Sequence, residues 1–368
     1  MSFATPLENE HRSLGASFTD FAGWQMPLKY DSDLTEHNAV RSVAGLFDLS
    51  HMGEIDVTGP DAARFLDHAL AGEFTAVTPG RAKYSLICND DGGVIDDLVA
   101  YRLGADQFLV VANASNAGAV FAELTERATG FDVAVTDRSQ TTALIALQGP
   151  AAESILLTLV PSVEAATVQE LKYYAATTAT VAEIPVLLGR TGYTGEDGFE
   201  LYVPNENAVD LWRALLEPTV RAGGVPAGLA CRDSLRLEAG MALYGHELSL
   251  DITPFEAGLG RVVRLNKKFV GSEALQKIAD TAPARTLVGL VGTGKRAARA
   301  QYAVHDAYDP NSVIGVVTSG ILSPTLGYPI ALAYLDSDRS RLGSTVLVDV
   351  RGGKLPFTVV KPPFYKRS

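Results

Sequence analysis

The chain has 368 residues, of which 47% are hydrophobic and 20% are charged, and its formal net charge is −12. This composition is typical of a soluble globular protein with more than one domain. The acidic balance argues against a nucleic-acid-binding protein, because contacts to phosphates require a basic surface. No apolar segment approaches the roughly 20 residues that a membrane-spanning helix needs.

The two cysteines, Cys88 and Cys231, form no CxxC pair and predict neither a disulfide framework nor a zinc site. The six histidines show no paired ligand spacing, so we expect no metal. The N-terminal segment has neither the apolar core of a signal peptide nor the acid-poor character of a transit peptide. We therefore expect a cytoplasmic protein that binds no nucleic acid and no membrane.

The first half of the chain contains an approximate repeat. A helix is predicted near residues 33–42, and residues 46–59 alternate as a strand before a helix that begins at Gly59-Pro60. The same succession of strand, Gly-Pro and helix recurs 90 residues later, at residues 143–159. Residues 108–126 (strand, break, helix) are likewise echoed by residues 199–217.

This periodicity predicts an α+β fold with two intertwined ferredoxin-like domains, approximately residues 45–140 and 141–235, within a region that spans residues 1–280. A cleft between two duplicated domains would be a natural ligand site. The remaining residues, 284–368, contain short apolar runs separated by turn residues. They predict a separate β-barrel or sandwich.

Residues 84–113 predict three consecutive strands with turns at Asn89–Gly93 and at Gly104. The adjacent Asp96 and Asp97 lie inside the middle strand, where successive side chains point to opposite faces. One carboxylate is therefore expected to face the interior, where it is a candidate for chemistry. Alternation alone does not choose between them, although the more apolar neighbours of Asp97 slightly favour that residue.

Three glycine-containing segments bear on ligand binding. Residues 289–296 have P-loop spacing, but Arg296 stands where a Ser or Thr should hold magnesium, so we expect no nucleotide. Residues 189–200 predict a turn at Asp197-Gly198 and place Glu200 on the following strand, where it could accept two parallel donors from a heterocycle. Residues 228–238 could open a helix at Asp233, with Arg232 just before it. The last two segments suggest a cleft for an anionic heterocycle.

Several segments, in this order along the chain, closely resemble the aminomethyltransferase family, the T-proteins of the glycine cleavage system. The segments are LFDLSHMGEIDVTGPDA, AKYSLICNDDGGVIDDL, GRTGYTGEDGFELYVP, GLACRDSLRLEAGMALYGHEL and SGILSPTLGYPIALAY. The resemblance implies a cloverleaf of two α+β domains and a C-terminal β-barrel domain around a central folate site. It also implies transfer of a one-carbon unit from the aminomethyl group on lipoylated H-protein to tetrahydrofolate, with no metal and no nucleotide.

The resemblance assigns roles residue by residue. The essential aspartate of the family corresponds to Asp96, its pteridine-binding glutamate to Glu200 and its folate-binding arginine to Arg232. The further residues expected around folate are Tyr84, Asn113, Tyr193 and Tyr365.

Two alternatives stay open. The chain could be a folate-binding protein of the same fold without glycine cleavage activity, or the folate-dependent partner of a demethylating flavin enzyme. The complete set of motifs favours the aminomethyltransferase.

Overall fold

The computed structural model describes residues 2–367, and the chain divides into two compact units. The first unit comprises residues 1–69, 73–85 and 98–233, and the second comprises residues 70–72, 86–97 and 234–368. The expected division near residues 280–284 therefore lies inside the second unit. Three elements cross from one unit to the other, namely strands β6 (Ala82–Cys88) and β7 (Val94–Arg102) and helix α8 (Leu229–Glu238).

The first unit opens with a small three-stranded sheet in the order β1-β3-β2. Its elements are β1 (Phe3–Ala4), α1 (Glu8–Ser13), β2 (Ser17–Phe21), β3 (Trp24–Lys29) and α2 (Asp33–Ser42). The helix predicted at residues 33–42 is confirmed as α2. Ser32 caps it, because its side chain accepts a hydrogen bond from the backbone of Thr35 at 3.1 Å.

A five-stranded sheet follows in the order β6-β7-β8-β5-β9. Its remaining elements are β5 (Gly53–Thr58), α3 (Ala62–Ala69), β8 (Gln107–Ala112), α4 (Ala117–Arg127) and β9 (Ala134–Asp137). Strands β5, β7, β8 and β9 with the two helices follow the ferredoxin-like succession, and β6 is added at the edge. The three strands predicted between residues 84 and 113 are confirmed as neighbours in this sheet.

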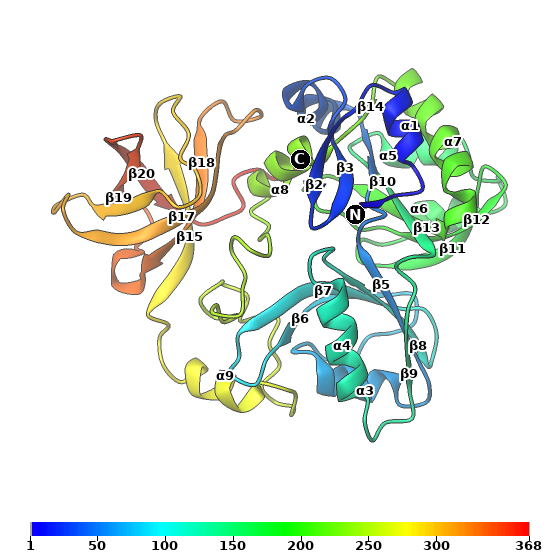
Figure 1. The fold of residues 1–368 in the computed structure, drawn as a ribbon, viewed down its shortest axis with the longest axis horizontal. Helices are drawn as coiled ribbons and strands as arrows, with labels where there is room; N and C mark the ends of the chain where they lie inside the picture. The colour runs from blue at the N-terminus through cyan, green and yellow to red at the C-terminus, as the bar shows by residue number, and fades with distance from the viewer. Residues whose placement is uncertain (1, 368) are drawn as a thin grey trace. The chain divides into compact units, whose positions relative to one another are not determined.

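A six-stranded sheet in the order β11-β12-β13-β10-β4-β14 completes the first unit. Its elements are β4 (Gly45–Asp48), β10 (Thr142–Gln148), α5 (Ala152–Leu157), α6 (Ala165–Glu170), β11 (Ala176–Val181), β12 (Ile184–Gly189), β13 (Gly198–Pro204), η1 (Asn205–Asn207), α7 (Ala208–Arg221) and β14 (Val225–Pro226). Helices α5 and α7 cover one face of the sheet (Figure 1), where Leu211, Trp212 and Leu215 are fully buried.

The two sheets repeat the same order of four strands, β6-β7-β8-β5 in one and β11-β12-β13-β10 in the other. The Gly-Pro turns correspond as well, because Gly59 and Gly149 adopt φ values of +133° and +138°. A Cβ at these positions would lie 2.4 Å from the carbonyl oxygen of Asp132 and 2.5 Å from that of Val43, respectively. Both turns therefore require glycine.

The prediction of a single strand at residues 46–59 is wrong, because β4 and β5 are separate strands in different sheets. The chain turns between them because Asp48 Oδ1 accepts a hydrogen bond from the backbone of Ser50 at 2.9 Å. The backbone of Met52 closes the turn on the carbonyl of Leu49 at 3.0 Å. As a result, β4 pairs with β10 of the second copy, which intertwines the two repeats.

The second unit contains α9 (Ser272–Ala279) and a closed barrel in the order β15-β18-β17-β16-β19-β20 (Figure 1). Its elements are β15 (Arg285–Gly292), β16 (Ala303–Asp306), β17 (Val313–Leu322), β18 (Pro329–Asp336), η2 (Ser337–Arg339), β19 (Thr345–Val350) and β20 (Gly353–Val360). The expected all-β region is thus a barrel. Strand β16 was not predicted, because its four residues include His305 and Asp306 and lack an apolar run.

Candidate functional site

Glu200 lies at the third position of β13, among hydroxyl groups of the first unit. Its Oε2 accepts hydrogen bonds from Thr191 Oγ1 at 2.5 Å, from Tyr101 OH at 3.0 Å and from Tyr202 OH at 3.4 Å. The hydroxyl oxygens of Tyr101 and Thr191 also lie only 2.6 Å apart. These two residues are 90 positions apart, so the hydroxyl cluster joins corresponding places of the two repeats.

The tyrosine hydroxyls stay protonated next to the carboxylate. Burial, reinforced by the charge of Glu200, raises the pKa of Tyr101 well above its ordinary value. Burial and the neighbouring Tyr101 and Glu200 raise the pKa of Tyr202 in the same direction. Both hydroxyls therefore remain donors at neutral pH.

None of the hydrogen bonds to Glu200 within residues 2–367 reaches Oε1. A carboxylate oxygen has about two lone-pair positions, and three donors already converge on Oε2. The carboxylate therefore presents one oxygen to a ligand rather than two. Recognition of two parallel donors by both oxygens, as the sequence suggested, would require one hydroxyl to give way.

Arg232 and Tyr193 form the second part of this site. The Arg232 guanidinium carbon lies 4.8 Å from the centre of the Tyr193 ring, in cation–π geometry. Burial lowers the pKa of Arg232, while the charge of Glu200 is among the influences that raise it. The ordinary arginine pKa is far above neutral, so this half-buried side chain remains a cation that can bind an anionic group.

The helix carrying Arg232 begins earlier than the sequence suggested. α8 starts at Leu229, so Arg232 lies within its first turn and Asp233 is not its N-terminal cap. The backbone N–H just before the helix is instead bonded by a residue far away in the sequence. The N–H of Gly228 donates to Glu36 Oε2 at 2.9 Å. A Cβ at residue 228 would lie 2.3 Å from the carbonyl oxygen of Leu28, so glycine lets the helix start there.

His51 is a buried neighbour of Arg232. Its side chain is 3% exposed, and its Nδ1 has no hydrogen-bond partner within residues 2–367. Burial, together with the charge of Arg232, lowers the pKa of His51 from 6.5 to about 4. The imidazole is therefore neutral at pH 7.

This shift predicts a pH dependence of stability. The unfolded chain protonates His51 near pH 6.5 and the folded chain only near pH 4, so the stabilisation is complete above pH 6.5 and is lost as the pH falls towards 4. Between pH 7.5 and 4.5 we expect His51 to account for about 2–3 kcal/mol of the decrease in the free energy of unfolding. Urea unfolding of the wild type and of His51→Gln at both pH values measures this decrease in the free energy of unfolding. His68→Gln is the control variant. An equal decrease in wild type and His51→Gln would contradict the prediction.

In the second unit, burial distinguishes the two adjacent aspartates of β7. Asp96 is fully buried, whereas Asp97 is half-buried. The slight preference of the sequence pattern for Asp97 as the interior residue is therefore wrong. Asp96 shares its strand face with Leu98 and Ala100, both buried.

The turn that precedes Asp96 is closely packed. Asn89 Oδ1 accepts a hydrogen bond from the backbone of Gly93 at 2.7 Å. A Cβ on Gly93 would lie 1.8 Å from the carbonyl oxygen of Leu250, and the backbone of Val94 donates to the carbonyl of Ile252 at 3.0 Å. This fit fixes the start of β7, and thereby Asp96, against residues 249–252.

Tyr244 lies near Asp96 on the loop that follows α8. Burial raises the pKa of Tyr244, and the charge of Asp96 adds to the shift. Its phenol therefore stays protonated and can donate a hydrogen bond. The sequence analysis did not select Tyr244, although it lies within one of the family-like segments, GLACRDSLRLEAGMALYGHEL.

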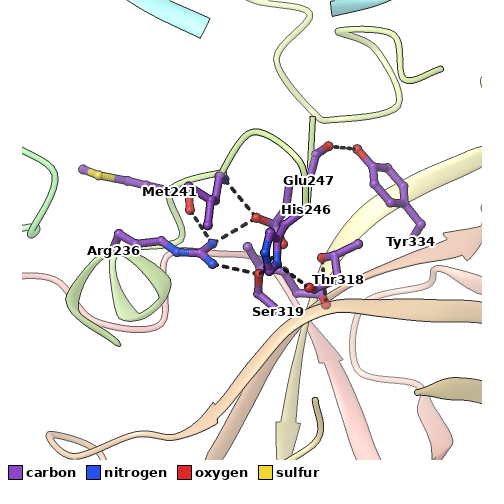
Figure 2. A network of polar contacts seen from close by, with 9 residues as sticks. Arg236, Met241, His246, Glu247, Thr318, Ser319 and Tyr334 are labelled. Carbon is purple, nitrogen blue, oxygen red and sulfur yellow. Dashed lines mark hydrogen bonds and ion pairs between the residues drawn. The ribbon is translucent and has the colours of Figure 1, made fainter. Parts of the chain in front are cut away.

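A buried ion pair anchors the loop that follows α8, on which Tyr244 lies (Figure 2). Arg236 Nη1 donates to Glu247 Oε2 at 2.9 Å, and both side chains are at most 1% exposed. Ser319 of β17 accepts from Arg236 Nη2 at 2.8 Å and donates to Glu247 Oε1 at 2.7 Å. The backbone of Leu243 donates to Glu247 Oε2 at 2.9 Å, and the hydroxyl of Tyr334 donates to the Glu247 carbonyl at 2.7 Å. The loop is thus tied to α8 and to the barrel.

Removing one partner of this pair should be costly. Arg236→Met leaves the Glu247 carboxylate buried without its cation, and we expect the free energy of unfolding to fall by about 3–5 kcal/mol. The double variant Arg236→Met/Glu247→Leu should recover most of that loss, because no buried charge remains. Chemical denaturation of the two variants measures the difference. The exposed pair Arg221–Glu217 is the control, where loss of the arginine should cost under about 1 kcal/mol. A double variant as unstable as the single one would contradict the prediction.

The end of α8 also holds the C-terminal tail. The carbonyl of Glu238 accepts hydrogen bonds from the backbones of Phe364 at 3.0 Å and Tyr365 at 2.8 Å. Its side chain binds the turn after β17, accepting from Thr325 Oγ1 at 2.8 Å. Tyr365, the tail residue expected to contact folate, is therefore fixed by its backbone and is half-buried.

The predicted site residues are distributed over both units. Tyr193, Glu200 and Arg232 are neighbours in the first unit. Tyr84 on β6 and the half-buried Asn113 directly after β8 belong to the same unit. Asp96 and Tyr365 belong to the second unit. The sequence analysis missed four residues next to the predicted ones, namely Tyr101, Thr191, Tyr202 and Tyr244. The strand pattern could have indicated Tyr202, because it lies two positions from Glu200 and residues two apart on a strand share a face.

Comparison with known proteins identifies the family. Residues 7–267 match the family described as the GCVT N-terminal domain, and residues 285–366 match the glycine cleavage T-protein C-terminal barrel domain. The chain belongs to the aminomethyltransferase family of glycine cleavage T-proteins. The recognition of the family from sequence motifs is therefore confirmed.

Individual relatives agree over nearly the full length. The chain is 56% identical to an aminomethyltransferase of Cutibacterium acnes, with 99% of this chain and 98% of that protein covered. It is 56% identical to one from Streptomyces avermitilis with the same coverage. The crystal structure of glycine cleavage system aminomethyltransferase T from Bartonella henselae superposes with a TM-score of 0.91 at 38% identity, covering 100% of this chain and 99% of that one. This structural similarity to a solved T-protein confirms the predicted α+β fold class with its C-terminal barrel.

The described part of the chain shows neither a metal-binding cluster of side chains nor a membrane-spanning helix. Within residues 2–367, no group of three or more His, Cys, Asp or Glu side chains is arranged to hold a metal ion. Among the helices of that range, none combines the length and apolarity required to cross a membrane.

Proposed function

We propose that this chain transfers the one-carbon unit of the aminomethyl group on lipoylated H-protein to tetrahydrofolate. The products are 5,10-methylenetetrahydrofolate, ammonia and dihydrolipoyl H-protein. The observation that carries the proposal is the match of both parts of the chain to the T-protein family. The cytoplasm, where tetrahydrofolate and H-protein would be available, is the proposed location.

The chemistry of the first-unit site supports tetrahydrofolate as the acceptor. Glu200 offers Oε1 to one N–H donor of the pteridine, and its other oxygen is held by three hydroxyls. Arg232 offers a cation next to the Tyr193 ring, which suits a carboxylate of the glutamate tail or the face of an aromatic ring. Tyr84, Asn113 and Tyr365 are proposed as further contacts.

Asp96 is the proposed catalytic group. Its carboxylate would orient the attacking folate nitrogen, accept its proton and stabilise the positive charge that develops as ammonia leaves. A fully buried carboxylate suits this role, because electrostatic interactions are stronger away from water. Tyr244, close enough for Asp96 to shift its pKa, would donate a hydrogen bond that holds the carboxylate in place.

The proposed docking of H-protein involves basic residues, since H-protein is expected to be acidic. The chain contains two clusters of basic residues that could serve, one at residues 261–268 and one at residues 295–299. Part of each cluster has an internal role, because Lys267 donates to the carbonyl of Leu70 at 2.6 Å and Lys295 to that of Gly327 at 2.7 Å. Arg261, Arg264 and Lys268 are exposed and remain available to steer an acidic partner.

A reconstituted assay tests the proposed function. Aminomethyl-loaded H-protein and tetrahydrofolate are mixed with the enzyme, and methylenetetrahydrofolate and ammonia are followed together; equal amounts are expected. Activity with an iminium derived from sarcosine or dimethylglycine, and none with loaded H-protein, would instead identify a demethylation partner. Folate binding without either activity would identify a binding protein.

A further inference from the structure

We propose, resting on the function proposed above, that Gln148 is a positioning residue for tetrahydrofolate binding. Gln148 is the last residue of β10, and its side chain is almost completely buried at 1% exposure. It is not among the residues proposed to contact folate. Its effect on binding is exerted through the loop between β12 and β13, from which both parts of the folate site receive a residue.

The amide of Gln148 bonds this loop at two points. Its Nε2 donates to the backbone carbonyl of Thr191 at 3.0 Å, and its Oε1 accepts from the hydroxyl of Thr194 at 2.9 Å. A carbonyl oxygen can only accept, so the amide nitrogen has to face Thr191 and the orientation of the amide is fixed. Thr191 and Thr194 are 3% and 0% exposed. Loss of either bond would therefore leave a buried polar group unpaired.

Two glycines give this side chain its space. Gly198 is the cross-strand partner of Gln148, and a Cβ on Gly198 would lie 2.3 Å from Gln148 Nε2. A Cβ on Gly192 would lie 2.0 Å from Gln148 Oε1. Atoms cannot approach so closely, so the loop packs directly on the amide only because both positions lack a side chain.

The loop carries a residue for each part of the folate site. The hydroxyl of Thr191 donates to Glu200 Oε2 at 2.5 Å, so the bond from Gln148 fixes the residue that orients this carboxylate. Tyr193 lies between the two residues that Gln148 bonds, and its ring centre is 4.8 Å from the guanidinium carbon of Arg232. A shift of the loop would therefore displace both the carboxylate proposed to bind the pteridine and the aromatic ring beside the cation.

A buried ion pair holds the far end of the loop. Arg41 of α2 donates from Nη1 to the carbonyl of Thr194 at 2.7 Å and to Glu196 Oε1 at 2.8 Å, and both charged side chains are at most 7% exposed. The backbone of Glu196 donates to Thr194 Oγ1 at 3.2 Å. Thr194 is thus anchored by the ion pair, and Gln148 connects it to Thr191. Without the amide of Gln148, the loop should loosen mainly at Thr191 and Tyr193.

Equilibrium titration of the full chain with tetrahydrofolate tests the proposal. Gln148→Met keeps the length of the side chain and removes both hydrogen bonds. We expect the Kd to increase about tenfold, because binding groups displaced by a fraction of an ångström no longer match the ligand. The kcat at saturating folate and the KM for H-protein should stay within about threefold of the wild type, since the residue acts on folate binding alone.

Two comparisons separate positioning from a loss of stability. Val348→Ala opens a cavity in the core of the barrel, where Val348 is fully buried, and should lower the melting temperature without changing the Kd. Hydrogen exchange at residues 190–197 should be faster in Gln148→Met than in Val348→Ala. In a Glu200→Gln background, Gln148→Met should multiply the Kd by a smaller factor than in the wild type, because both changes act through one carboxylate.

The outcomes are distinct. If Gln148→Met does not fold, Thr194→Val removes one of the two bonds and should increase the Kd about threefold. The proposal is overturned by an unchanged Kd in the folded variant, by an equal increase in Val348→Ala, by the same factor in both backgrounds, or by unaltered exchange at residues 190–197. A wild type that binds no tetrahydrofolate would overturn the proposed function and this inference with it. Binding by the wild type with an equal Kd in Gln148→Met would overturn this inference alone.

Discussion

Replacing Asp96 with asparagine is expected to lower the kcat of one-carbon transfer by about 10³-fold, within the range of general acid–base catalysis. Asparagine has the same shape but cannot take the proton of the attacking nitrogen or stabilise a developing positive charge. The Kd for tetrahydrofolate should change by less than about threefold, because the interaction lost is one made mainly in the transition state. Single-turnover assays with loaded H-protein give the rate, and fluorescence titration gives the Kd.

Asp97→Asn is the matched control for this experiment. Asp97 is the adjacent, half-buried carboxylate of the same strand, and its replacement should leave the rate near that of the wild type. The assignment of Asp96 fails if Asp96→Asn retains most of the activity, or if Asp97→Asn is the more damaged enzyme.

Replacing Glu200 with glutamine is expected to weaken tetrahydrofolate binding by about 10- to 100-fold, since a charged acceptor is exchanged for a neutral one. The variant should fold, because an amide can take the place of Oε2 among hydroxyls that rotate to suit it. The rate at saturating folate should change far less than in Asp96→Asn. Equilibrium titration with tetrahydrofolate measures the effect.

The hydroxyl cluster provides a graded comparison. Tyr101→Phe removes the 3.0 Å hydrogen bond to Glu200 and Tyr202→Phe removes the 3.4 Å one. We expect Tyr101→Phe to weaken folate binding more than Tyr202→Phe, and both to have less effect than Glu200→Gln. A Kd unchanged by Glu200→Gln would remove this residue from the binding site, whatever the tyrosine variants do.

Local sequence determined the elements whose signals are short-range. Turn residues and alternation located the three strands between residues 84 and 113, and the Ser32 cap fits α2. Short apolar runs between turns located all the barrel strands except β16. The repeated Gly-Pro turns indicated the duplication, and the turns themselves need glycine because backbone carbonyls stand 2.4–2.5 Å from where a Cβ would lie.

The features that depend on residues far apart in the sequence were visible only in the tertiary structure. The chain turns between β4 and β5, and the two strands enter different sheets. α8 starts before Arg232 because Glu36, 192 positions away, accepts the free backbone donor of Gly228. Three hydroxyls from three strands or loops leave Glu200 a single open oxygen.

The family motifs selected Asp96, whereas the strand pattern leaned towards Asp97. Periodicity states only that neighbouring residues face opposite ways. Which face is buried depends on what packs against the strand, and packing is a property of the folded chain.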